Sequence, residues 1–212
     1  MAVAVERLTL LHTSTLRVGE DPRRWRIYRN GYQSWSGTWT IGVDERDRDL
    51  PTAFARTGAT DARHPAPTGR GHVRSDALSA VSDATSGDAL AVGFTTLADA
   101  FVFVEVRAPA GAPPELSAWV DLDGTVLAAG EATPWFAVRL AAVSGNRTAG
   151  TNALRRVAEA AGAAMEARGI DRPHPGGWCS WYFYFTKVTE ADVLDNLAVL
   201  AGGAVLYVDQ VS

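Results

Sequence analysis

The stretch Ala100-Phe-Val-Phe-Val-Glu-Val106 is built from aromatic and β-branched residues, which are typical of β-strands. A second stretch, Arg24-Trp-Arg-Ile-Tyr28, alternates polar and apolar residues, as a half-buried strand does. Gly, Pro, Asp and Ser residues separate these runs from others of the same character, namely 89–94, 116–120 and 135–140. The first 145 residues therefore predict an antiparallel β-sandwich with little helix.

The character of the sequence changes near residue 150. Residues 152–168 are alanine-rich, carry apolar side chains at helical spacing and are followed by Gly169. The stretch Asp171-Arg-Pro-His-Pro-Gly-Gly177 then interrupts any regular structure. We expect three parts: a β-sandwich domain over residues 1–150, a linking helix and linker over 151–172, and an α/β part over 173–212.

The last part reads as strand, helix, strand. Residues 178–185 are aromatic and apolar, as in a strand that is buried on both faces. Thr189-Glu-Ala-Asp192 is a helix start of the capping-box type, and Gly202-Gly203 ends that helix. Ala204-Val-Leu-Tyr-Val208 is a second short apolar strand. Two strands joined by a helix favour a parallel pair, the first βαβ unit of an α/β fold.

The composition is that of a soluble globular protein, with 47% hydrophobic and 21% charged residues. A net charge of −4 argues against a nucleic-acid binder, and no apolar run is long enough to cross a membrane. The single cysteine, Cys179, excludes an intrachain disulfide, and we expect it to be a small buried residue. Because no secretory signal is recognisable, we expect a cytoplasmic protein. Only His64 and His72 lie close together among the four histidines, so no metal site is expected.

Two motifs place aromatic residues beside small polar ones: Asn30-Gly-Tyr-Gln-Ser-Trp-Ser36 and Gly176-Gly-Trp-Cys-Ser-Trp-Tyr-Phe-Tyr-Phe185. An aromatic ring at a strand end can face a pocket, and neighbouring amides and hydroxyls can bind the hydroxyls of a sugar. The alternatives are a hairpin turn with buried rings for the first motif and a core strand for the second. Spacing alone does not decide between them.

The second motif, followed by Thr189-Glu and Val193-Leu-Asp-Asn-Leu197, resembles the start of the barrel in the retaining α-galactosidases of the melibiase type, glycoside hydrolase family 36. The first motif is similar to the tryptophan motif of that family's N-terminal β-domain. The resemblance covers essentially the whole chain, tightly at 29–36 and 175–200. It implies a β-sandwich packed against a (β/α)₈ barrel whose active site lies at the C-terminal ends of the barrel strands.

The resemblance also implies the chemistry. One aspartate attacks the anomeric carbon of a terminal α-galactosyl residue, as in melibiose or raffinose, and a second protonates the leaving oxygen. No cofactor or metal is required, and a homo-oligomer of the full-length parent is left open. In the family, the residues that correspond to Trp35, Trp181 and Tyr182 line the galactose pocket.

The resemblance breaks down over the last four residues. The family's second barrel strand ends in Gln-Ile/Val-Asp-Asp, whereas Gln210-Val211 is followed here by Ser212. A shifted match makes Asp209 a candidate sugar ligand, with an ordinary strand-end aspartate as the alternative. A complete barrel takes ~250 residues, so we expect a truncated product in which the nucleophile and the acid/base are missing. Two alternatives remain: a non-catalytic carbohydrate-binding β-sandwich, and an inactive truncated gene product.

Overall fold

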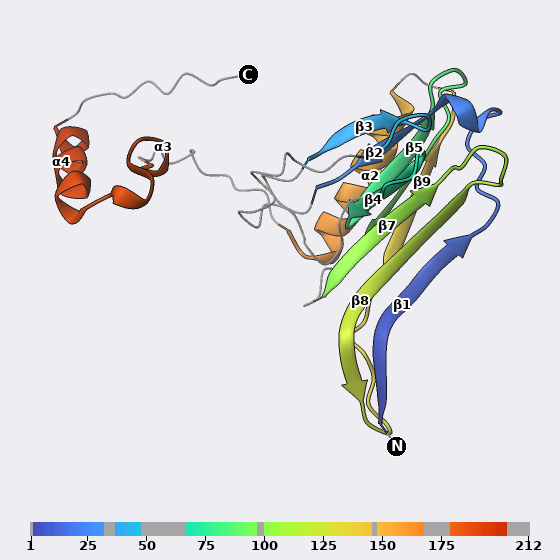
Figure 1. The fold of residues 1–212 in the computed structure, drawn as a ribbon, viewed down its shortest axis with the longest axis horizontal. Helices are drawn as coiled ribbons and strands as arrows, with labels where there is room; N and C mark the ends of the chain where they lie inside the picture. Colours follow the sequence, from blue (N-terminus) through green and yellow to red (C-terminus); the bar gives the residue numbers. More distant parts are fainter. Residues whose placement is uncertain are drawn as a thin grey trace. The chain divides into compact units, whose positions relative to one another are not determined.

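The computed structural model describes residues 2–31, 37–47, 67–96, 100–145, 148–167 and 179–202. The chain divides into two compact units, Met1–Arg168 and Gly169–Ser212, which are described separately. The described residues of the first unit form antiparallel sheets and the helix α2 (Ala149–Ala164) (Figure 1). The antiparallel β structure predicted for this part of the chain is therefore confirmed.

Two sheets make up the first unit, and every neighbouring pair of strands within them runs antiparallel. The four-stranded sheet has the order β1 (Val3–Thr13), β8 (Glu115–Leu127), β7 (Phe101–Arg107) and β4 (His72–Asp76). The five-stranded sheet has the order β3 (Trp39–Gly42), β2 (Trp25–Arg29), β5 (Leu78–Asp83), β6 (Ala89–Phe94) and β9 (Val138–Val143). A short 3₁₀ turn, η1 (Pro22–Arg24), precedes β2.

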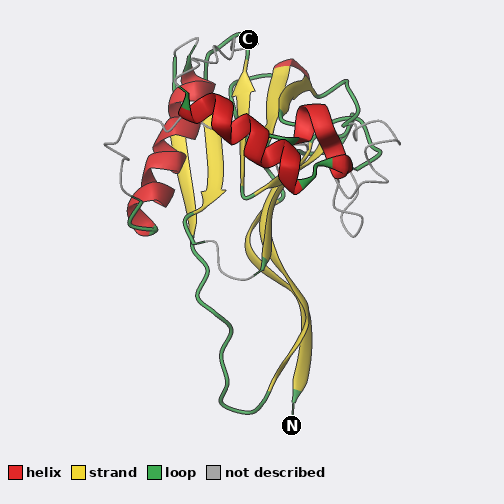
Figure 2. Cartoon of the chain, turned by 90° about the vertical axis from the view of Figure 1, so that its left-hand side faces the viewer, coloured by secondary structure: helices red, strands yellow, loops and turns green. Residues whose placement is uncertain are grey.

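The two sheets share one apolar core. Alternate residues of each strand point into it, because successive side chains of a strand face opposite ways. Val104, Val106 and Val120 of the four-stranded sheet are fully buried there, as are Ile27 and Val81 of the five-stranded sheet. Both views show β1 and β8 continuing together past the other strands towards the N-terminus (Figures 1 and 2). The ends of these two strands therefore lie beyond the shared core.

The tryptophans of the first unit serve different purposes. Trp25 is fully buried, and its indole N–H donates to the carbonyl of Val18 at 2.7 Å. Trp119 is also buried and packs against Phe103, with 4.5 Å between the ring centroids and the ring planes tilted by 34°. Trp135, in contrast, is 79% exposed. Burial with a satisfied N–H identifies Trp25 as core filler, whereas Trp135 contributes little to the core.

Helix α2 (Ala149–Ala164) packs on the outer face of the five-stranded sheet. Its buried residues, Ala149, Ala153 and Val157, meet a layer of small strand residues formed by Ala80, Ala89, Ala91 and Ala141. Gly93 lets the helix approach closely, since a Cβ atom there would lie 2.4 Å from Val157 Cγ1. The helix that we predicted as a link between domains therefore packs against the sandwich and belongs to the first unit.

The described part of the second unit is helical. It contains α3 (Trp181–Tyr184), the 3₁₀ turn η2 (Phe185–Lys187) and α4 (Glu190–Ala201). The prediction of a strand over 178–185 is wrong for Trp181–Tyr184. A buried strand needs neighbours to pair with, whereas a helical turn satisfies its backbone locally. Accordingly, the Tyr184 N–H donates to the carbonyl of Ser180 at 2.9 Å.

The predicted start of α4 is confirmed. Thr189 Oγ1 accepts a hydrogen bond from the Asp192 N–H, and Asp192 Oδ2 accepts one from the Thr189 N–H at 2.8 Å. The second predicted strand, 204–208, lies outside the described residues, so a βαβ unit is not confirmed. Of the helices that the structure describes, none is long and apolar enough to cross a membrane.

The packing of α2 can be tested by replacing its central buried residue. Val157→Asp would place a carboxylate against the alanine layer, and we expect the free energy of unfolding to fall by about 3 kcal/mol. Arg156→Asp is the control, since Arg156 is exposed on the same helix. Urea denaturation of both variants measures the difference, and equal stability would show that α2 does not pack on the sheet.

Candidate functional site

The motif Asn30–Ser36 lies in the connection between β2 and β3, two neighbouring antiparallel strands. Residues 32–36, which include Trp35, are outside the described residues. The described part of this site is therefore the base of the connection, formed by Asn30 and Gly31 at its start and Gly37 and Thr38 at its end.

Hydrogen bonds close this base. The Gly31 N–H donates to Thr38 Oγ1 at 3.0 Å, which joins the two ends of the connection. The Asn30 side-chain amide donates to the carbonyl of Asp76 at 2.8 Å, and the Asp76 N–H donates to the carbonyl of Asn30 at 3.1 Å. Because Asp76 ends β4, Asn30 joins the five-stranded sheet to the four-stranded sheet where the connection begins.

Two buried serines support the same end of the sandwich. Ser75 and Ser79 are at most 1% exposed, and both hydroxyls donate to the carbonyl of Tyr28, at 3.2 and 2.7 Å. Ser75 Oγ also accepts from the Asn30 N–H at 3.3 Å. Buried polar groups are costly unless they are hydrogen-bonded. These hydrogen bonds therefore fix the backbone of residues 28–30.

Arg29 is a site residue that the sequence analysis did not identify. It occupies an inward-facing position of β2, in register with the core residues Trp25 and Ile27. Its Nε atom lies 3.2 Å from Oδ2 of Asp47, and the two side chains are 10% and 0% exposed. Its Nη1 atom donates to the carbonyl of Gly37 at 3.1 Å. The sequence carries one indication of this role: Arg29 is a charged residue at a position of β2 where the alternating pattern predicts an apolar one.

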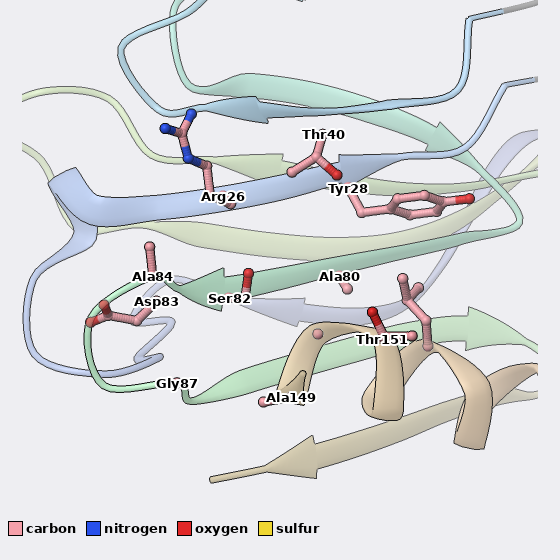
Figure 3. Close-up of a pocket in the computed structure, with 12 residues that line it drawn as sticks. Arg26, Tyr28, Thr40, Ala80, Ser82, Asp83, Ala84, Gly87, Ala149 and Thr151 are labelled. Carbon is pink, nitrogen blue, oxygen red and sulfur yellow. The ribbon is translucent and has the colours of Figure 1, made fainter. Parts of the chain in front are cut away.

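A groove on the outer face of the five-stranded sheet extends from the start of α2 towards this base (Figure 3). Its volume is about 580 Å³, and its polar groups include Arg26, Thr40, Ser82 and Thr151. Tyr28 also lines it, with its hydroxyl 3.5 Å from Oδ1 of Asn30. In the described part of the chain, no three His, Cys, Asp or Glu side chains come together as a metal site would require. The groove is therefore lined by hydroxyls, by the Arg26 cation and by the Asp83 carboxylate, which accepts backbone hydrogen bonds from Thr85 and Ser86.

The strongest electrostatic cluster surrounds Glu105 on the outer face of the four-stranded sheet. Glu105 is 2% exposed, accepts from Arg107 at 3.0 Å and from the Trp119 indole at 3.2 Å, and contacts His72. Burial alone would raise its pKa. The hydrogen bonds from His72 and Arg107, with the charges of Arg107 and Arg74, outweigh burial and lower the pKa to about 2. A carboxyl group that is ionised throughout the neutral range cannot act as a general acid, so we assign Glu105 a structural role.

The residues predicted to bind substrate are described only in part. Trp181 lies in α3, is 44% exposed and meets Phe185 edge-on with 5.8 Å between ring centroids. Tyr182 lies in the same helix, but its side chain is outside the described residues, as are Trp35 and Asp209. Cys179 is exposed, so the expectation that it is buried is wrong. It lies at the edge of a helical turn instead of inside a core strand. The assignment of Trp35, Trp181, Tyr182 and Asp209 to substrate binding remains a prediction.

Comparison with known proteins adds no relative: no family model, no curated protein and no solved structure matches the chain.

The role of Glu105 predicts a specific dependence of stability on pH. In the unfolded chain its pKa returns to the ordinary value near 4.5, so the stabilisation is fully present above that pH and is lost as the pH falls towards 2. Glu105→Gln should therefore lower the free energy of unfolding by about 2 kcal/mol at pH 7, and this difference should shrink between pH 5 and pH 2.

Glu131→Gln is the matched control, because Glu131 is exposed. Chemical denaturation at several pH values measures both variants against the wild type. A deficit of Glu105→Gln that stays constant from pH 7 to pH 2 would contradict the lowered pKa.

Proposed function

We propose that this chain is the N-terminal part of an α-galactosidase-type glycoside hydrolase, which removes terminal α-galactosyl residues from substrates such as melibiose and raffinose. The supporting observation is the position of the motif Asn30–Ser36. It lies between two paired strands, and its base is tied to both sheets through Asn30. A ring that stacks on a sugar needs such a support, because loose placement loses binding energy.

In this proposal Trp35 contributes a stacking surface to the galactose pocket. The flat ring covers the apolar face of the sugar, and neighbouring polar residues of the motif, Gln33 and Ser34, bind hydroxyls. The assignment of Trp181, Tyr182 and Asp209 to sugar binding rests on the family resemblance alone.

Residues 173–212 form the first βαβ unit of a (β/α)₈ barrel in this proposal, and α4 is its helix. The side chains of α4 support this assignment, since Leu194 and Leu197 are each more than half exposed and Val193, on the same helix face, is 42% exposed. Three large apolar side chains on a 12-residue helix are what a barrel helix buries against its sheet. The helical turn at Trp181–Tyr184 does not match the first strand of such a unit, so α4 alone supports this assignment.

The two catalytic aspartates are assigned to later barrel strands, outside these 212 residues. The parent enzyme retains the anomeric configuration, which requires two carboxyl groups roughly 5–5.5 Å apart. The described residues contribute binding and support, and no residue among them is assigned to bond cleavage.

A second candidate function, non-catalytic carbohydrate binding by the sandwich itself, is favoured by one observation. Trp135 is 79% exposed, and its chain neighbours Pro134 and Phe136 line a groove of about 640 Å³ together with Phe101 and Asp121. An exposed indole beside a groove with aromatic walls and a carboxylate suits a sugar ring. The two candidates differ in which tryptophan contacts the sugar.

The first test is enzymatic. The purified 212-residue chain should show no hydrolysis of a chromogenic α-galactoside above the rate of a heat-denatured sample, because both catalytic carboxylates are assigned outside it. Measurable turnover by the purified chain would show that this assignment is wrong.

The second test uses the tryptophans as reporters. We expect added galactose to shift the indole N–H resonance of Trp35 in an NMR spectrum, where Trp35→Phe identifies that resonance by its loss. The resonance of Trp135, identified with Trp135→Phe, should not move. A shift of Trp135 alone would favour the carbohydrate-binding alternative, and a shift of neither would contradict both candidates.

A further inference from the structure

We propose that Arg29 is a positioning residue for the connection between β2 and β3: its guanidinium fixes the backbone of Gly37, where this connection returns to β3. The inference rests on the proposed function, because it takes Trp35 as the sugar-contacting residue. It concerns described residues only, namely Arg29, Gly37, Trp39 and Asp47.

The guanidinium reaches both connections that flank β3. On one side, Nη1 donates to the carbonyl of Gly37, the second residue after Trp35. On the other side, Nε lies 3.2 Å from Oδ2 of Asp47, which follows β3 by five residues. One buried side chain therefore holds the end of the first connection and the start of the second.

Gly37 is fixed from a second direction by Trp39. A Cβ atom on Gly37 would lie 1.8 Å from the Trp39 ring, so the backbone of Gly37 lies against that ring. The same ring lies 5.1 Å from the guanidinium carbon of Arg29, measured to the ring centroid. Gly37 is thus confined between an aromatic ring and a hydrogen bond. Asn30 and Gly31 fix the opposite end of the connection through Asp76 and Thr38.

Stability alone does not explain a charged pair at this place. Arg29 takes an inward position of β2 that apolar residues occupy at Trp25 and Ile27. Removing two charges from water offsets much of their attraction, and apolar pairs of similar size are often equally stable. What an apolar pair cannot do is donate to the carbonyl of Gly37. Arginine suits this task because its planar fork presents several N–H donors in fixed directions, whereas lysine is a single flexible point charge.

The test separates orientation from stability with two variants and a control. Arg29→Lys keeps the positive charge but loses the planar guanidinium with its several N–H donors. The double variant Arg29→Met with Asp47→Leu removes both charges and keeps the volume. Val81→Ala is the control, because Val81 is fully buried in the core and pairs with Ile27 instead of Arg29. Amide hydrogen exchange measured by NMR on the full chain follows the N–H of Gly31 and Thr38, and thermal unfolding reports global stability.

We expect both Arg29 variants to speed the exchange of these two amides at least tenfold under native conditions. Val81→Ala should leave them within twofold of the wild type, because loop amides exchange through local opening and not through global unfolding. The double variant should unfold at a temperature close to that of the wild type and still show the fast exchange. Slow exchange in Arg29→Lys or in a folded double variant would overturn the proposal.

The galactose titration of the Trp35 resonance, repeated on the variants, connects this role to function. A wild-type resonance that galactose does not move would count against the proposed function, and the exchange rates would still decide the role of Arg29. Where the wild type responds, both Arg29 variants should need at least tenfold more galactose for the same shift. An unchanged response in the variants would overturn the proposal.

Discussion

The rest of the first unit depends on one constraint: the central strands of the five-stranded sheet are apolar on both faces. Five of the six residues of β6 are buried, and in β5 the apolar residues Ala80 and Val81 are buried on opposite faces. One face of these strands meets the valines of the four-stranded sheet, and the other meets the alanines and Val157 of α2. A sheet with two apolar faces has to be covered twice, so the helix is a required layer of the domain.

The sequence predicted β2, β6 and β7 closely, but it missed β5, the middle strand of the five-stranded sheet, and the edge strands β1, β3 and β4. The runs 24–28 and 100–106 correspond within one residue to β2 and β7, since dense aromatic and β-branched residues mark buried strands. Strand β1 was missed because its pattern mixes Glu6, Arg7 and His12 with apolar residues at a sheet edge. The run 135–140 begins three residues before β9, because Trp135 is apolar yet exposed. Composition does not distinguish an exposed indole from a buried one.

The sequence pointed to the motif at residues 30–36, but it did not point to the residues that hold the base of this connection. The pattern of residues 30–36 drew attention to the β2–β3 connection, but its fixing partners, Asp47 and Asp76, are remote in sequence. Such pairs become visible only when the strand register is known, since register decides which residues face inward. The strand over 178–185 was mispredicted for a related reason: aromatic residues signal burial, and burial alone does not specify extended backbone.

The confinement of Gly37 between Trp39 and Arg29 has a consequence for protein engineering. Gly31, which is bonded to Thr38, and Gly37, which is bonded to Arg29, are two fixed attachment points of the β2–β3 connection, much as a variable loop is attached to an immunoglobulin framework. A library that changes only residues 32–36 keeps these two attachment points. A library that extends to residues 29, 37, 39 or 47 changes the framework itself. Grafting the loop onto another sandwich would therefore require moving these four residues with it.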